Sequence, residues 1–130
     1  MEELMDVLLS VKPEFANLIF NGTKQYEYRR NMFCERNINR VMVYASSPVK
    51  KIVGEFQIED ILYDDINTLW TNTRNKSGIS KKYFLQYFSN KSMGYAIKIS
   101  TIRSYDIPLH LNSINVSTPP QSFMYLDRNI

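Results

Sequence analysis

The sequence is poor in the residues that build covalent cross-links, metal sites and phosphate-binding loops. Its 130 residues include one cysteine, Cys34, one histidine, His110, and four glycines. A lone cysteine forms no internal disulfide, and one cysteine with one histidine argues against a zinc site. No glycine-rich phosphate loop is present. His110 has no cysteine partner nearby in the sequence, and Cys34 shows no sign of activation beyond nearby Arg36. We therefore expect no metal, no cofactor and a reducing, cytoplasmic setting.

Long hydrophobic runs and a secretory signal are also lacking. No apolar stretch approaches the ~20 residues that span a bilayer, and the first ten residues carry three acids, Glu2, Glu3 and Asp6. A secretory signal needs a positively charged start and a longer apolar stretch. What is present is an ordinary globular composition, with 44% hydrophobic and 22% charged residues. The sequence thus predicts one domain over residues 1–130, without membrane association.

Basic residues cluster along the chain, although the net charge is only +3. Residues 71–91 hold five lysines or arginines and no acid, and 13% of the chain is aromatic. Basic stretches among aromatic side chains are compatible with nucleic-acid binding, and the alternative is a pair of solvated charged faces. The candidate contacts to a nucleic-acid backbone are Arg74, Lys76, Lys81 and Lys82.

The stretch FNGTKQYEYRR carries the densest functional signal. Gly22 suits the residue after a helix, because glycine takes a positive φ without strain. A strand is expected over residues 25–30, and its period of two places Glu27 and Arg29 together on one face. Lys24 stands at the entrance of this strand, where its flexible ammonium can reach either face.

The rest of the chain alternates between strand and helix patterns. Strands are expected at 7–11, 40–45, 52–59 and 93–102, helices at 13–21, 66–73 and after Ser80, a loop over 31–39, and an outward turn over 103–108. The last helix carries an aromatic stripe of a kind typical of a core face: Tyr83, Phe84, Tyr87 and Phe88. Antiparallel strands with few, clustered helices predict an α+β fold.

Four blocks of the sequence resemble the ASCH domain family, which belongs to the PUA-like superfamily. Gly22-x-Lys24-x-x-Glu27-x-Arg29 is similar to the family signature GxKxxExR. The other blocks are Leu8–Pro13, which resembles the first strand and helix entry, Val43–Pro48, which resembles the third strand and its turn, and Pro119–Phe123, which resembles a C-terminal segment of a bacterial and phage subgroup. The resemblance implies a partly open β-barrel of mostly antiparallel strands with about three flanking helices. It also implies that residues 119–130 pack on that barrel.

The resemblance implies a ligand cleft between the barrel and the first helix, with the signature residues at its rim. There Arg29 can fork onto a phosphate or a base edge, Glu27 can accept from an amino group, and Lys24 can meet a phosphate. The alternative is an exposed Glu27–Arg29 ion pair that contributes about 0–1 kcal/mol.

Further candidate ligand residues end the first and third strands. They are Ser10, Lys12, Tyr44, Ser46 and Ser47. Strand ends beside a helix N-terminus favour anions, and an exposed tyrosine such as Tyr44 can stack on a base of any sequence. The alternative is that the serines close turns and Tyr44 belongs to the core.

The resemblance favours a module that binds RNA or a nucleotide-like ligand. One branch of the family is an amidohydrolase that acts on N4-acetylcytidine with a Lys, a Thr and a Glu. Lys24 matches the first of these, but Glu27 stands where the Thr is expected and residues 71–80 contain no acid. A ribonuclease is another enzyme alternative, and an adaptor that binds a protein partner in a regulatory complex is a third.

Neighbouring charges bear on whether the signature residues can move a proton. A general base at neutral pH needs a lysine whose pKa is lowered by burial or a carboxylate whose pKa is raised by it. Glu27 lies two residues from Arg29, and this cation favours the ionised form of Glu27. Lys24 lies three residues from Glu27, whose charge favours the charged form of Lys24. The sequence thus predicts a binding site, with Lys24 as a catalyst only in the enzyme alternative.

Overall fold

The computed structural model describes residues 4–34 and 37–126. Its strands are β1 (Met5–Val11), β2 (Tyr26–Arg29), β3 (Ile38–Ala45), β4 (Lys51–Asp65), β5 (Met93–Leu109) and β6 (Phe123–Leu126). Its helices are α1 (Pro13–Phe20), α2 (Ile66–Thr73) and α3 (Lys81–Tyr87), with two short 3-10 helices, η1 (Arg74–Lys76) and η2 (Leu111–Ile114). The order of elements confirms the predicted α+β fold.

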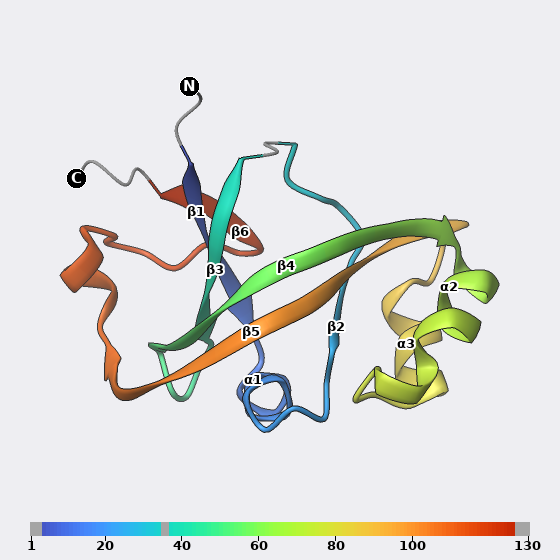
Figure 1. The fold of residues 1–130 in the computed structure, drawn as a ribbon, viewed down its shortest axis with the longest axis horizontal. Coiled ribbons are helices and arrows are strands. Elements are labelled where there is room, and N and C mark those ends of the chain that lie inside the picture. The colour runs from blue at the N-terminus through green and yellow to red at the C-terminus, as the bar shows by residue number, and fades with distance from the viewer. Residues whose placement is uncertain (1–3, 35–36, 127–130) are drawn as a thin grey trace.

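The six strands form one sheet in the order β2-β5-β4-β3-β1-β6 (Figure 1). β1 and β3 are parallel, and the other neighbouring strands are antiparallel. Within the described residues β2 and β6 are the two edges, so the sheet is a partly open barrel and not a closed one. The two edges nevertheless approach each other: Arg29 of β2 donates a hydrogen bond to the Oγ of Ser122, the residue just before β6.

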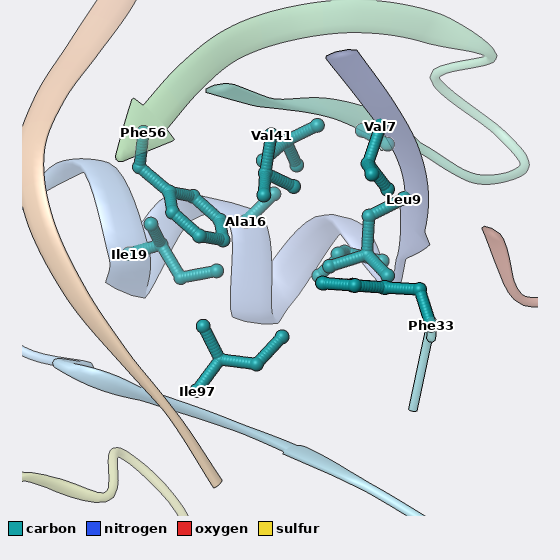
Figure 2. Close-up of a cluster of buried hydrophobic side chains, with 11 residues drawn as sticks. Val7, Leu9, Ala16, Ile19, Phe33, Val41, Phe56 and Ile97 are labelled. Atoms are coloured by element: carbon teal, nitrogen blue, oxygen red, sulfur yellow. The ribbon is translucent and has the colours of Figure 1, made fainter. Parts of the chain in front are cut away.

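The main core lies between α1 and the bent sheet. Ala16 and Ile19 of α1 pack there with residues from four strands (Figure 2): Val7, Leu9, Val41, Phe56 and Ile97. Pro13 begins the helix, and Glu14 lies in its first turn, where the helix dipole favours an acid. A helix of eight residues is marginal by itself, so this burial holds α1 in place beneath the candidate site.

A second apolar cluster attaches α2 and α3 to the sheet. It comprises Leu69, Phe84, Phe88, Tyr28 and Ala96. Asp65 caps α2 by accepting from the Thr68 amide, and Ser80 caps α3 by accepting from the Tyr83 amide at 3.1 Å, as predicted for Ser80. The Ser80 cap fixes the start of α3, which carries one wall of the site described below.

Two glycines take the roles that their positions indicate. Gly22 follows α1 with φ of 86°, and its amide donates to the Ile19 carbonyl at 3.1 Å, which confirms the predicted helix end. Gly54 sits where the β4 register shifts, and a Cβ there would lie 2.6 Å from both the Arg103 carbonyl and the Phe20 ring. Glycine is therefore required for this close approach of β4, β5 and α1.

Two strands are longer than the pattern predicts. β4 continues to Asp65, and β5 continues to Leu109, so the outward turn expected over residues 103–108 is wrong. The two strands pair from Ile52 opposite Leu109 to Asp65 opposite Met93. Hydrogen bonding along this ladder overrides the irregular local polarity of both segments. β3 also begins earlier than predicted, at Ile38.

The C-terminal strand lies along β1. Residues 123–126 pair antiparallel with Asp6–Leu9, and Phe123 and Tyr125 pack against the main core. Residues 127–130, which belong to the predicted C-terminal segment, lie outside the described part of the chain. Among the described residues, no helix is long and apolar enough to cross a membrane.

Candidate functional site

A cavity of about 410 Å³ lies at the open side of the barrel, between β2, the end of β1, α1 and α3. It brings together five of the predicted ligand residues: Ser10, Lys12, Lys24, Glu27 and Arg29. Four aromatic side chains form much of its wall: Phe15, Tyr28, Tyr83 and Tyr87. Ligand pockets are commonly about 300–1,000 Å³, so this cavity is large enough for a small molecule or one unit of a polymer.

Lys24 is buried in this cavity, at 2% exposure, and does not swing freely at the strand entrance. Its Nζ donates to the Ser77 carbonyl at 2.8 Å and lies 4.9 Å from the Tyr28 ring centroid. A Cβ on Gly78 would lie 2.7 Å from Lys24 Cβ, so glycine permits this close packing. Burial lowers the pKa of Lys24, although the charge of Glu27 opposes the shift. The charge of Glu27 favours the charged form, as expected, but desolvation outweighs it, so Lys24 is more readily available as a neutral proton acceptor than its neighbours alone predict.

Glu27 is also buried, at 7% exposure. Burial raises the pKa of Glu27, while the charges of Lys24 and Arg29 act in the opposite direction. The cationic neighbours favour the ionised form, as expected, but burial has the larger effect. Arg29 Nη1 lies 3.6 Å from Glu27 Oε2, longer than the roughly 2.7–2.9 Å of a strong charged hydrogen bond. This is not the exposed ion pair that was the alternative.

Arg29 links the two edges of the sheet and has unused hydrogen-bonding capacity. One of its terminal nitrogens donates to Ser122 Oγ, while its Nε is buried and has no hydrogen-bond partner among the described residues. A buried donor without an acceptor costs about 1–3 kcal/mol. A ligand whose acceptor atoms form further hydrogen bonds with this guanidinium would recover part of that cost.

The aromatic stripe of α3 is divided between the core and the cavity. Phe84 and Phe88 are buried, as expected, and Tyr87 packs against the same cluster, but Tyr83 and Tyr87 also line the cavity, so the stripe is not core alone. Lys12 Nζ lies 5.4 Å from the Tyr83 ring, and the Arg30 guanidinium lies 4.9 Å from the Tyr87 ring. Residue type could have predicted this division, because the two tyrosines, which carry hydroxyl groups, are the members of the stripe that reach the cavity.

The other three predicted ligand residues, Tyr44, Ser46 and Ser47, line a neighbouring hollow of about 450 Å³. This hollow shares Ser10 and Lys12 with the first cavity, because β1 pairs with β3 and places Ser10 beside Tyr44. Tyr44 is only 4% exposed and packs in an apolar cluster. No open ring face is left for a base, so the expected stacking role of Tyr44 is wrong.

The predicted backbone contacts lie on the surface next to α3. Arg74 and Lys76 are exposed on η1, and Lys81 and Lys82 are exposed in the first turn of α3. The segment between them supplies the Ser77 carbonyl that holds Lys24. A stripe of these four cations along a nucleic acid stays a prediction.

Sequence reasoning missed several lining residues, notably Arg30, Asn31, Gln121 and Ser122. The block Pro119–Phe123 was noticed by resemblance, but not as part of a site. Only the pairing of β6 with β1 carries Gln121 and Ser122 back to the N-terminal half of the chain.

The donor groups of the cavity suit an anion. Its lining includes four cations and one carboxylate: Lys12, Lys24, Arg29, Arg30 and Glu27. Among residues 4–34 and 37–126, no group of three or more His, Cys, Asp or Glu side chains is arranged to hold a metal ion.

Comparison with known proteins gives a consistent family. The model of the ASCH domain family matches residues 9–103. The chain is 30% identical over 125 residues to an ASCH domain-containing ribonuclease of Zymomonas mobilis, and this match covers 93% of the chain and 84% of the ribonuclease.

Two proteins of Ureaplasma parvum contain similar segments. Identity is 31% over 125 residues with ATP synthase subunit alpha and 29% over 120 residues with the large ribosomal subunit protein uL22. The chain spans only 16% of the first protein and 39% of the second. The similarity therefore concerns a part of each of these longer proteins.

Solved structures show the same architecture. The crystal structure of ASCH from Zymomonas mobilis superposes with a TM-score of 0.88 at 29% identity, covering 95% of this chain and 89% of that one. The N-terminal domain of Staphylothermus marinus McrB shares the fold alone, with a TM-score of 0.52 at 14% identity over 84% of this chain and 78% of that one. With its signature strand, its partly open barrel and these matches, the chain belongs to the ASCH domain family of the PUA-like superfamily.

Proposed function

We propose that this protein binds RNA, or a nucleotide-like fragment of it, in the cavity between β2, α1 and α3. The observation that carries the proposal is the composition of one cavity, in which four cations and one buried carboxylate lie among aromatic walls. Phosphates require cations, bases require flat apolar faces, and base edges require fixed polar groups. All three kinds of partner are present within about 410 Å³.

Each group has a distinct role in this proposal. Arg29 offers a planar fork to a phosphate or to a base edge, and Glu27 accepts from, or when protonated donates to, the same base. Lys12 and Arg30 approach phosphates from the rim, and each lies over a tyrosine ring. The two tyrosines thereby hold the cations and flank the space for the base.

The comparison with relatives supports RNA as the class of ligand. The Zymomonas mobilis protein that matches over most of its length is named a ribonuclease. A chain with the same barrel and a cationic cavity has the features needed to hold the same kind of polymer.

The test is a titration of fluorescently labelled single-stranded RNA with Arg29→Ala and its matched control, Arg103→Ala. Arg29→Ala is expected to weaken binding by about 1–3 kcal/mol, the range for one bidentate contact. Arg103 is an exposed arginine, with 73% of its side chain accessible, outside the cavity lining. The control removes the same charge and is expected to change affinity little. Equal affinities for both variants, with unchanged circular dichroism, would remove Arg29 and the cavity from the binding site.

RNA hydrolysis is the second candidate function. It is favoured by the buried pair in which burial lowers the pKa of Lys24 and raises the pKa of Glu27, because both shifts are in the direction that proton transfer at neutral pH needs. A neutral Lys24 amine would take the proton of a 2′-hydroxyl as its oxygen attacks the phosphorus. A protonated Glu27 would give its proton to the departing 5′-oxygen.

Hydrolysis is tested with an RNA oligonucleotide and its 2′-deoxy counterpart. Cleavage of the RNA alone, abolished in Lys24→Met and in Glu27→Gln, would establish the enzyme. Intact RNA after prolonged incubation would exclude the ribonuclease and would leave RNA binding as the proposed function. Hydrolysis of N4-acetylcytidine is not expected, because Glu27 occupies the Thr position and residues 71–80 hold no acid.

A further inference from the structure

A further hollow, distinct from the charged cavity and from the hollow beside Tyr44, lies next to a pair of tyrosines on the long β4–β5 ladder. It measures about 450 Å³, and its lining includes Arg30, Asn31, Tyr63, Asn90, Lys91 and Tyr95. Arg30 and Asn31 also line the charged cavity, so this hollow adjoins the cavity. We propose that a single-stranded RNA whose one nucleotide occupies the cavity places its neighbouring base on the Tyr63–Tyr95 pair. This inference rests on the proposed function and extends it to a second subsite.

The register of the sheet connects this hollow with the cavity. Arg29 of β2 is opposite Tyr95 of β5, and Tyr95 is opposite Tyr63 of β4. Directly opposed residues on neighbouring strands project from the same face of a sheet. The face that carries Arg29 in the cavity therefore continues across β5 to Tyr63, since β5 lies between β2 and β4 in the sheet; β4 and β5 run together in Figure 1.

The tyrosine pair is suited to stacking. Its ring centroids are 4.5 Å apart with the planes tilted by 32°. Tyr63 is 56% exposed, so much of its ring meets solvent, while contact with Tyr95 restrains its position. Any base can stack on an aromatic ring whose position is restrained in this way, because every base has a π face.

The charge of the hollow favours a nucleic acid over a protein or lipid partner. Its lining contains two cations, Arg30 and Lys91, and no acid. The Arg30 guanidinium is already positioned over the Tyr87 ring at 4.9 Å, between the cavity and this hollow. A phosphate that joins the two nucleotides would meet Arg30, and the next phosphate would meet Lys91. Asn31 and Asn90 can form hydrogen bonds with the edges of the base.

The experiment compares a mononucleotide, CMP, with a mixed-sequence RNA hexanucleotide in binding to wild type, Tyr63→Ala and Tyr63→Phe. Tyr63→Ala is expected to weaken binding of the hexanucleotide roughly five- to hundredfold and to leave CMP binding unchanged. Tyr63→Phe keeps the π face and is expected to behave as wild type. Lys91→Ala is expected to reduce the slope of log affinity against log salt by about 0.7 for the hexanucleotide.

Two control variants remove an apolar and a cationic side chain on β5, outside the lining of the hollow. Ile107 is an exposed apolar side chain, at 81% exposure, and Lys98 is a partly exposed cation that pairs with Glu59. Ile107→Ala and Lys98→Ala are expected to preserve hexanucleotide affinity within a factor of two or so. A hexanucleotide with 2-aminopurine at one position at a time is expected to show quenching that Tyr63→Ala abolishes at one position.

The outcomes separate this inference from the proposed function. If CMP binds but Tyr63→Ala leaves hexanucleotide affinity unchanged, or weakens both ligands equally, the second subsite is refuted and the cavity stands. If Tyr63→Ala alters sedimentation of the free protein without altering RNA binding, the pair is a contact between copies of the chain. If neither ligand binds, both proposals fail together.

Discussion

Two clusters of charged side chains lie on the same sheet, and they differ in how completely their charges are paired. The first, here called the ladder cluster, consists of Asp6, Arg40 and Glu55 from β1, β3 and β4. Arg40 Nε lies 3.0 Å from Asp6 Oδ2, and Arg40 Nη1 lies 2.8 Å from Glu55 Oε1. Burial by itself lowers the pKa of Arg40, but the hydrogen bond and charge of Asp6 and the charge of Glu55 prevail and raise it.

The second cluster, here called the cavity cluster, consists of Lys24, Glu27 and Arg29. Its ion pair is longer, at 3.6 Å, and Arg29 Nε has no partner among the described residues. Burial moves the pKa of Lys24 down and that of Glu27 up, against the effect of their neighbours. Tight pairing in the ladder cluster joins three strands, whereas loose pairing in the cavity cluster leaves polar groups for a ligand. The difference suggests that the two clusters respond differently to the same substitution.

Arg40→Met has the largest expected effect on stability. It leaves Asp6 and Glu55 without the cation that they share. Because the Arg40 side chain is 34% exposed, the expected cost is about 2 kcal/mol, below the roughly 3–5 kcal/mol of a fully buried pair. The free energy of unfolding, from urea titration, is the measurement. RNA affinity of the folded variant is expected to be unchanged. A loss below about 1 kcal/mol would show that the ladder cluster is not a structural pair of this kind.

Lys24→Met is the matched substitution in the cavity cluster. An apolar side chain of similar length removes the desolvation cost of a buried cation but also the hydrogen bond to the Ser77 carbonyl. These changes nearly cancel, and the free energy of unfolding is expected to stay within about 1 kcal/mol of wild type. RNA affinity is expected to fall. Destabilisation as large as that of Arg40→Met would make Lys24 a structural residue.

Glu27→Gln tests the burial of the carboxyl group through pH. The pKa of Glu27 is raised in the folded protein, so folding favours the protonated form. That contribution is fully present below the ordinary pKa of 4.5 and is lost as the pH rises through the folded pKa. Glutamine does not ionise, so the stability of Glu27→Gln relative to wild type should increase from about pH 4 to about pH 7. Melting curves across this range are the measurement, and a difference that stays flat or reverses contradicts the dominance of burial.

Reversing Lys81 and Lys82 to Glu has the smallest expected effect on stability, within about 0.5 kcal/mol, because both side chains are exposed. If they contact a nucleic-acid backbone, RNA affinity should fall for all sequences, and the salt slope should flatten by about 0.7 for each lost phosphate. The matched control reverses Lys98 and Arg103 on β5. Equal effects in both variants would show that net charge alone is responsible and that α3 carries no backbone contacts.

The sequence predicted the parts of the site that depend on local backbone geometry. The alternation of β2 placed Glu27 and Arg29 on one face, and Gly22 marked the end of α1 through its positive φ. Ser80 was recognised as a cap because the contact reaches only to Tyr83. Such features depend on a few adjacent residues, so the pattern of residue types is sufficient to find them.

Only the tertiary structure decided how these residues are buried and which others join them. Lys24 donates to a carbonyl 53 residues away, and Arg29 donates to a serine 93 residues away. Desolvation depends on all the atoms that surround a charge, and most of these come from segments that are distant in sequence. The sequence therefore determined that a lysine, a glutamate and an arginine stand close together. The folding of β2, α3 and β6 around them decided that burial, and not the charge of their neighbours, sets the pKa values of Lys24 and Glu27.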